Sequence, residues 1–260
     1  MILERTQDPR WLSNTWLVGD RPGGKAVLID TGGPIEPIEA ALREHRLTLT
    51  HVLCTHHHID HVAHNADYVE AHRCAVCAHP AELPLFERWA AESLPASAQP
   101  TLALSGGDEL ATGDLRIRAL HVPGHTLGQL AFLVNEERVF TGDTLFRGSV
   151  GGTRATGHGS FEQLVHSICD VLLELPPGTR VHPGHVDETT IERERAENPF
   201  VRAWRGLDLP RSEACTALGQ PARLLLRARD YDGGTKCWVR FEDGREDVVP
   251  GSRVVARGLE

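Results

Sequence analysis

Four side chains of the kind that bind metals fall within six consecutive positions, and this cluster constrains the chain more than any other feature: His56, His58, Asp60 and His61. An apolar run over residues 48–54 leads straight into the cluster and predicts a buried strand. His56 and His58 are two positions apart, so in an extended loop both side chains point the same way. Imidazole and carboxylate are ligands that a borderline-soft divalent ion prefers, so the segment predicts part of a metal site.

Three further candidate ligands stand in a shared context, directly after a glycine at the end of a predicted strand: His125, Asp143 and His185. Glycine there lets the backbone turn sharply and approach its neighbours closely. Loops at strand ends are where a rigid scaffold presents functional side chains. The chain has 15 histidines, so a single one carries little information. The cluster together with these three predicts a metal centre.

Length and charge exclude several classes of protein. The chain has 260 residues, enough for one large domain with a small appendage. Its formal net charge is −9 and no block of lysine or arginine stands out, which argues against nucleic acid as a partner. The N-terminus has no apolar signal core and no run of about 18 apolar residues occurs, so we expect a cytoplasmic protein that does not engage a membrane.

The six cysteines are scattered, and in a reducing compartment they would be free thiols. Cys74 and Cys77 form a Cys-x-x-Cys pair without a second pair to complete a four-thiolate site. The segment around them is apolar, so we interpret both as buried residues of a strand.

Mixed helices and strands precede a tail of different character. We predict a catalytic domain over residues 1–207 and a small all-β, SH3- or Tudor-like unit over residues 208–260. We expect this tail to pack on the main domain or on a second subunit, as in a homodimer. The main domain suits an α/β sandwich with helices on both outer faces, and the pattern leaves a doubly wound sheet as the alternative.

Periodicity and turn signals predict the main elements. The expected helices cover Pro37–Arg46, Asp60–Glu70, Ser160–Leu175 and Glu188–Glu197, the third with a capping box at Ser160 and Gln163. The expected strands cover Trp11–Val18, Lys25–Asp30, Thr48–Cys54, Arg73–Ala78, Leu115–Val122, Gln129–Asn135, Arg138–Thr141 and Thr179–His182. In the tail they cover Ala222–Ala228, Cys237–Phe241 and Glu246–Val249.

The spacing His56-x-His58-x-Asp60-His61, with the later His125, Asp143 and His185, resembles the metallo-β-lactamase superfamily. Asp30-Thr-Gly-Gly33 after a strand is also similar to that family. The resemblance implies an αββα sandwich with a two-metal site at one edge. Four segments are most similar to the short glyoxalase II-like (hydroxyacylglutathione hydrolase-like) enzymes: His121–Gly128, Thr141–Phe146, Pro183–His185 and Glu197–Phe200.

This resemblance implies a role for each ligand. His56, His58 and His125 would hold one metal, and Asp60, His61 and His185 the other. Asp143 would bridge them, since a shared anion offsets the repulsion of two dications. Zinc is the expected metal, with iron and manganese as alternatives. The implied reaction is hydrolysis of a small-molecule acyl substrate, such as the thioester of a low-molecular-weight thiol, by hydroxide that bridges the metals. Asp60 would orient this nucleophile and carry its proton.

The chain also departs from the glyoxalase II-like pattern. The loop after Asp143 has Arg154 where an acidic residue is common, and His158 is additional. We expect this loop to cover the site, where the two side chains either select the substrate or remain solvated. No helical domain that would grip glutathione follows, which argues against that thiol. We interpret His57 as a bystander that points away and His64 as a neighbour of the site rather than a ligand.

Two other activities fit the same superfamily. A persulfide dioxygenase would use one iron, but the retention of all seven ligands favours two metals. A lactonase often places a tyrosine beside the substrate carbonyl, and we rank it lower because neither Tyr68 nor Tyr231 follows Asp143 within the main domain. In the tail, Tyr231, Trp238 and Phe241 form either an aromatic recognition surface or the core of the small unit, and we favour the core.

Overall fold

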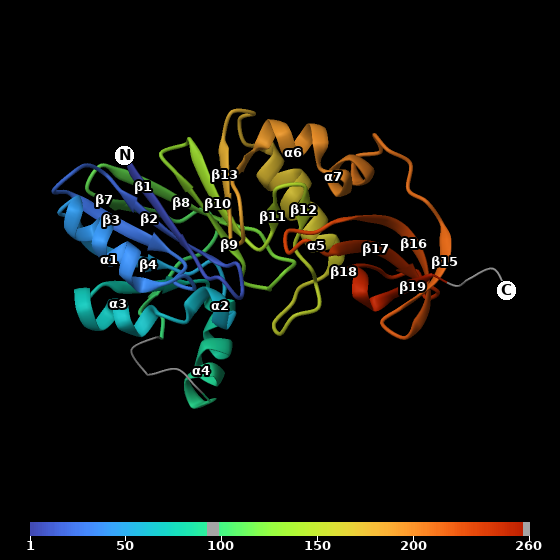
Figure 1. The fold of residues 1–260 in the computed structure, drawn as a ribbon, viewed down its shortest axis with the longest axis horizontal. Coiled ribbons are helices and arrows are strands. Elements are labelled where there is room, and N and C mark those ends of the chain that lie inside the picture. The colour runs from blue at the N-terminus through green and yellow to red at the C-terminus, as the bar shows by residue number, and fades with distance from the viewer. Residues whose placement is uncertain (93–98, 257–260) are drawn as a thin grey trace.

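Two six-stranded sheets pack face to face in the computed structural model, which describes residues 1–92 and 99–256, and helices cover both outer faces (Figure 1). This is the αββα arrangement that the resemblance implied, and the doubly wound alternative is wrong. A third, five-stranded sheet formed by the tail lies beside the second of these layers (Figure 1).

The first sheet has the order β1-β2-β3-β4-β5-β6. Its strands are β1 (Ile2–Gln7), β2 (Asn14–Gly19), β3 (Lys25–Ile29), β4 (Thr48–Leu53), β5 (Ala75–Ala78) and β6 (Leu102–Ala103). Its outer face is covered by α1 (Ile35–Glu44), α3 (Asn65–His72) and α4 (Leu83–Glu92), and a 3-10 turn over Pro80–Glu82 precedes α4. The strands β3, β4 and β5 run parallel, so their carboxyl ends meet at one edge of the sheet.

The second sheet has the order β14-β13-β10-β9-β8-β7. Its strands are β7 (Glu109–Thr112), β8 (Leu115–His121), β9 (Leu130–Val134), β10 (Arg138–Gly142), β13 (Arg180–Pro183) and β14 (Thr189–Thr190). A two-stranded ribbon, β11 (Leu145–Phe146) with β12 (Ser149–Val150), follows β10. The helices α5 (Phe161–His166), α6 (Ile191–Glu197) and α7 (Pro199–Trp204) pack on its outer face.

The sequence of β3 is a continuous apolar run after Lys25, and the structure shows why. Val27 and Ile29 face the second sheet, whereas Ala26 and Leu28 face the helices. Both faces of the strand are therefore buried, as in sheets that are covered on both sides.

The single helix predicted over Asp60–Glu70 is wrong, because two short helices, α2 (Ile59–Val62) and α3, replace it. The backbone of Thr31 enters the break: its amide donates to the carbonyl of His61 at 2.7 Å, and its carbonyl accepts from the amide of His64 at 3.2 Å. These bonds satisfy groups that a continuous helix would have paired internally.

Two other helix predictions need adjustment. The capping box at Ser160 and Gln163 is confirmed, but after His166 the helix continues as a π turn over Ser167–Val171 and a 3-10 turn over Leu172–Glu174. Thr189 and Thr190 extend the second sheet, so α6 begins later than predicted, with the Thr190 side chain accepting from the Arg193 amide.

The tail forms a sheet of order β18-β17-β16-β15-β19 that packs on the main domain. Its strands are β15 (Glu213–Ala217), β16 (Gln220–Arg229), β17 (Thr235–Phe241), β18 (Glu246–Pro250) and β19 (Val254–Ala256), with a 3-10 turn over Gly251–Arg253. Phe241 lies in the sheet's own core, as predicted. Trp238 instead packs on Phe161 and Trp204 of the main domain, with ring centroids 6.1 and 6.4 Å apart.

The cysteines are free thiols, and the interpretation of Cys74 and Cys77 as buried is confirmed. Burial raises the pKa of Cys77 to about 12, so it stays protonated. In the described parts of the chain, none of the helices combines the length and apolar character needed to cross a bilayer.

Candidate metal centre

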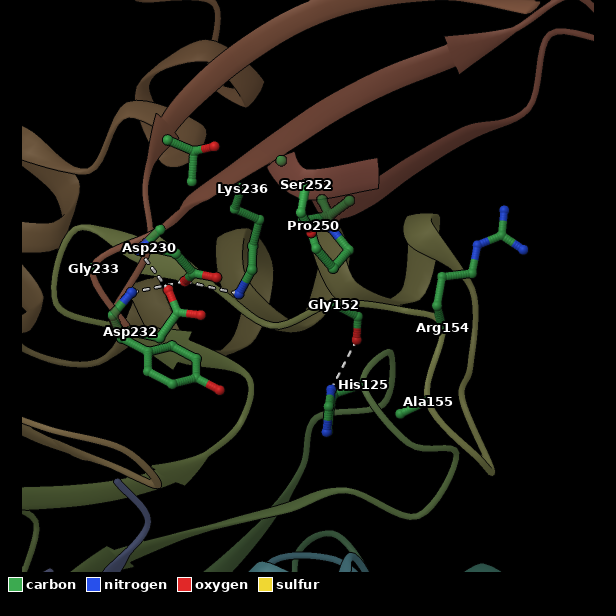
Figure 2. A pocket seen from close by; sticks show the side chains of 15 residues that line it. His125, Gly152, Arg154, Ala155, Asp230, Asp232, Gly233, Lys236, Pro250 and Ser252 are labelled. Atoms are coloured by element: carbon green, nitrogen blue, oxygen red, sulfur yellow. Dashed lines mark hydrogen bonds and ion pairs between the residues drawn. The ribbon is translucent and has the colours of Figure 1, made fainter. Parts of the chain in front are cut away.

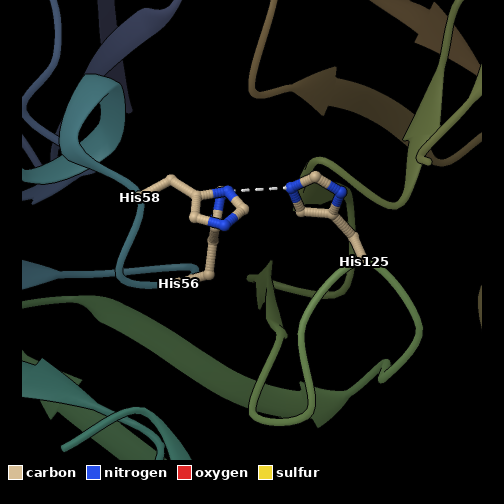
Figure 3. A group of neighbouring side chains, drawn as sticks. All are labelled: His56, His58 and His125. Carbon is tan, nitrogen blue, oxygen red and sulfur yellow. Dashed lines mark hydrogen bonds between the residues drawn. The ribbon is translucent and has the colours of Figure 1, made fainter. Parts of the chain in front are cut away.

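Three imidazoles converge at the edge of the sandwich where strands of both sheets end (Figure 3). His56 and His58 lie in the loop after β4, and His125 comes from the loop between β8 and β9. The Nδ1 atom of His58 lies 2.9 Å from Nε2 of His56 and 3.0 Å from Nε2 of His125. Three ring nitrogens thus point at one position.

A second group forms beside the first from Asp60, His61 and His185. Asp60 and His61 lie in α2, and His185 follows β13. The two imidazole Nε2 atoms are 3.3 Å apart, and each is 3.6 Å from Oδ2 of Asp60.

Asp143, which follows β10, lies between the two groups. Its Oδ2 is 3.6 Å from Nε2 of His125 and 3.2 Å from Nε2 of His185, while its Oδ1 is 3.4 Å from Nε2 of His61. The Oδ1 atom is buried and has no hydrogen-bond partner among the described residues. A buried carboxylate oxygen without a partner is costly, and a cation would satisfy it.

The distances between these atoms suit metal coordination. Two ligands of a tetrahedral zinc ion, each at about 2.0–2.1 Å, lie roughly 3.3 Å apart. The five distances given above between donor atoms of the same group are 2.9–3.6 Å. The donor set of five imidazoles and two carboxylates therefore fits two divalent ions by geometry and by chemistry.

Hydrogen bonds on the outer ring nitrogens orient the imidazoles. Backbone carbonyls accept from three of them: Thr156 from Nε2 of His58 at 3.0 Å, Gly152 from Nδ1 of His125 at 2.8 Å, and Trp11 from Nδ1 of His185 at 3.0 Å. Because a carbonyl only accepts, the proton of each ring lies on the outer nitrogen. The inner nitrogen then presents its lone pair to the centre, as metal ligation requires.

Asp30 orients the other two imidazoles through one carboxylate oxygen. Its Oδ2 accepts from Nδ1 of His61 and from Oγ1 of Thr55, both at 2.8 Å. Thr55 Oγ1 in turn accepts from Nδ1 of His56 at 3.0 Å. Asp30 adopts a φ of 56°, a backbone conformation that aspartate and asparagine tolerate better than most residues. It thus supports one ligand in each group.

The surroundings of the candidate ligands shift the pKa values of four of the imidazoles. Burial lowers the pKa of His56 and His125, and burial with the neighbouring His125 lowers the pKa of His58 to about 3. These rings are therefore neutral near pH 7 and free to bind. Burial also acts to lower the pKa of His61, but the carboxylates of Asp143 and Asp60 outweigh it and raise that pKa.

The glycines that precede His125 and His185 are needed where the backbone makes close approaches. Gly124 has a φ of 142°, and a Cβ there would lie 2.6 Å from the Cα atom of Leu164. A Cβ on Gly184 would lie 2.4 Å from Oδ1 of Asp143. Both Pro-Gly-His segments therefore need glycine, because the backbone of Gly124 packs against α5 and the backbone of Gly184 packs against Asp143 of the centre.

The loop with Arg154 and His158 lies against the centre, since Gly152 and Thr156 accept from two of its imidazoles. The Arg154 guanidinium, however, pairs with Asp247 of the tail and lies over the Phe241 ring. The Nδ1 of His158 lies 2.7 Å from the carbonyl of Gly159. Neither side chain belongs to the groups that could hold a metal.

The remaining histidines of the cluster have structural contacts. His57 does not belong to the groups that could hold a metal, as predicted, but it has a structural contact that the sequence did not indicate. Its Nδ1 pairs with the buried carboxylate of Glu82, which also accepts from the Gly128 amide at 2.8 Å. His57 thereby ties the ligand loop to the loop that carries His125. His64 pairs with Asp67 at 3.1 Å and does not belong to the groups that could hold a metal.

Sequence reasoning missed Tyr231 as a residue of this site. Its ring stacks on the imidazole of His185, with centroids 4.5 Å apart and an interplanar angle of 16°, and it also contacts Phe146. The prediction that Tyr231 belongs to the core of the tail is wrong. No local signal distinguishes it, because the contact joins two loop residues 46 positions apart, one after β13 and the other between β16 and β17.

Comparisons with known proteins agree with this geometry. The family model of the metallo-beta-lactamase superfamily matches residues 8–185. The hydroxyacylglutathione hydrolase GloC of Haemophilus influenzae is 32% identical over 191 residues, covering 68% of this chain and 88% of that protein. The crystal structure of ETHE1 from Myxococcus xanthus is 30% identical with a TM-score of 0.63, covering 81% of this chain and 93% of that one.

A third similar structure was solved with metal bound. The crystal structure of TTHA1623 in a di-iron-bound form is 38% identical with a TM-score of 0.64, covering 77% of this chain and all of that one, 100%. A metal pair of this kind is thus on record in a protein similar to this chain.

Proposed function

The chain belongs to the metallo-beta-lactamase superfamily, and from this premise we propose that it is a binuclear metal-dependent hydrolase that cleaves thioesters. The observation that carries the proposal is the pair of ligand groups that share Asp143. All seven side chains are present, and five outer hydrogen bonds hold the imidazoles in the ligating orientation. Similarity to a hydroxyacylglutathione hydrolase supports the thioester class.

His56, His58 and His125 would hold one ion, Asp60, His61 and His185 the other, and Asp143 would contribute to both. When bound, the two ions supply an acidified water and Lewis acidity toward a carbonyl oxygen. Zinc suits this donor set, and the similar di-iron protein keeps iron as an alternative.

We propose that Asp60 moves the proton. Its side chain keeps 23% of its surface exposed, against 9% for Asp143, so it reaches both the ligand group and solvent. A carboxylate in this position can take a proton from the attacking water and release it to solvent. A thiolate with a pKa of about 8.5 leaves with little acid assistance, so no second proton donor is required.

The test combines metal content with hydrolysis. Protein loaded with zinc, manganese or iron should contain two ions per chain by elemental analysis and hydrolyse thioesters in a thiol-release assay. His61→Ala should lower kcat/KM by at least about a hundredfold, since losing a ligand costs no less than losing an outer-shell partner. His64→Ala is the matched control and should retain activity, because His64 contacts Asp67 rather than the centre. Two bound ions without turnover of any thioester would contradict the proposal.

A persulfide dioxygenase remains the second candidate, because of the similarity to ETHE1. It predicts one iron per chain and oxygen consumption with a persulfide. A lactonase is the third. Tyr231 belongs to the tail and not to the main domain, but its ring stacks on His185, so a tyrosine is present beside the centre. Lactones and persulfides therefore belong in the same substrate panel, with oxygen uptake measured in parallel.

A further inference from the structure

A cavity of about 690 Å³ lies between the metal centre and the C-terminal sheet (Figure 2). His125 and Gly152 form its wall on the side of the centre, and the turn between β16 and β17 forms the opposite wall. The cavity therefore starts at His125, a candidate ligand, and Tyr231 of that turn lies between the cavity and His185, on whose ring it stacks. A volume of this size encloses most of a small-molecule ligand.

The basic side chains on this cavity are already paired. Lys236 is buried and donates to the Val150 carbonyl at 2.6 Å, and it pairs with Asp230 at 3.0 Å. Arg154 pairs with Asp247, and its side chain extends away from His125 (Figure 2). Neither cation is left to receive an anionic group of a ligand.

Asp232 is the exception among the charged residues that line the cavity. Its Oδ1 accepts from the Gly234 amide at 2.8 Å, and no ion pair involves this carboxylate within residues 1–92 and 99–256. It is exposed at the cavity wall. The charge of Lys236 also reaches Asp232, but Lys236 already pairs with Asp230, so two carboxylates share one ammonium on this wall. The net charge that a ligand meets here, apart from the centre itself, is therefore negative.

We propose that this cavity binds the thiol half of the thioester and selects a thiol without net negative charge over an anionic thiol such as glutathione. The inference rests on the proposed thioester hydrolysis. Acyl groups such as lactoyl are small, whereas the thiols that carry them are large, so a cavity of this volume suits the thiol. Glutathione carries two carboxylates, which would meet Asp232 without a free cation to pair with.

The experiment compares ligands that differ in charge and hardly in shape. Zinc-loaded protein is assayed with S-lactoylglutathione and with its diethyl ester, and binding of S-methylglutathione and its diethyl ester is measured by calorimetry. We expect the esters to have the higher kcat/KM and the tighter binding. Asp232→Asn keeps an oxygen that can accept from the Gly234 amide. It should reduce the ester-to-acid ratios of kcat/KM and of affinity by about two- to fivefold, the range for one exposed charge pair.

Asp243→Asn is the matched control. Asp243 is an exposed turn aspartate at the other end of β17 whose Oδ1 accepts from the Arg245 amide at 3.0 Å, and it does not line the cavity. The inference would be overturned if the protein preferred the ligands with free carboxylates, or if Asp232→Asn left the ester-to-acid ratios of kcat/KM and of affinity unchanged. Neither result would contradict the proposed hydrolysis. Selective binding of the esters without hydrolysis of either thioester would support the cavity's selectivity, and turnover of thioesters of other thiols would then decide the proposed reaction.

Discussion

Replacing Asp30 with asparagine tests the centre without removing a ligand. The carboxylate is buried, and Oδ2 accepts from both His61 and Thr55 while Oδ1 accepts from the Thr55 amide at 2.8 Å. Asparagine has the same shape and tolerates the φ of 56°. In either amide orientation, however, an NH₂ group must face at least one of these donors.

The size of the effect follows from these bonds. If the amide nitrogen faces His61, that ring must accept at Nδ1 and carry its proton on Nε2, the atom that faces the ligand group. Exchanging a charged acceptor for a neutral one weakens each hydrogen bond by about 1 kcal/mol. Loss of such an outer partner lowers metal affinity about ten- to hundredfold, equivalent to about 1.4–2.7 kcal/mol. The metal affinity of the group with His61 should fall most, because Asp30 bonds that ring directly. The affinity of the group with His56 should fall less, because Thr55 lies between Asp30 and His56.

The assay is a competition titration of each ion against a chromophoric chelator at fixed pH, with unfolding followed by circular dichroism. Asp20→Asn is the control, since Asp20 is a buried carboxylate that accepts from the Lys25 amide at 2.8 Å and touches no histidine of the centre. We expect that control to bind both ions normally. If Asp30→Asn also bound both ions within twofold of the parent, Asp30 would not hold His61 in its ligating form.

Three other outcomes are expected. Removing the metal with a chelator should lower Tm. An ion at a free concentration of about 100 Kd contributes about 2.7 kcal/mol to the free energy of unfolding, or roughly 5–10 °C in Tm for a chain of this size. A Tm independent of zinc in scanning fluorimetry would contradict this. Gly184→Ala should weaken metal binding with little loss of secondary structure by circular dichroism, because the added Cβ would clash with Oδ1 of Asp143. An unchanged metal content would show that the centre tolerates this clash. Because Asp143 and Asp60 outweigh burial and raise the pKa of His61, that imidazole holds a proton near neutral pH in the metal-free protein. Binding must displace the proton, so affinity should rise with pH, and calorimetry in buffers of different ionisation heat should detect release of about one proton.

Local pattern was sufficient for the elements that bury a regular face. The strand β3 was predictable from its run of apolar residues, and the start of α5 was predictable because a capping box joins two residues at a fixed spacing. Strand β1 was not predicted, since it is an edge strand with two exposed charged side chains, Glu4 and Arg5. The break between α2 and α3 was also missed, because its cause is the backbone of Thr31, which lies in another loop.

The sequence by itself identified the seven candidate ligands, because four of them are clustered within six positions and the other three each follow a glycine at the end of a predicted strand. Only the tertiary structure decided which groups surround them. The stacking of Tyr231 on His185, the pairing of Lys236 with Asp230 near that ring, and the diversion of Arg154 to Asp247 each depend on how the C-terminal sheet docks. Such contacts form when distant surfaces become complementary, and no periodicity within either segment encodes them.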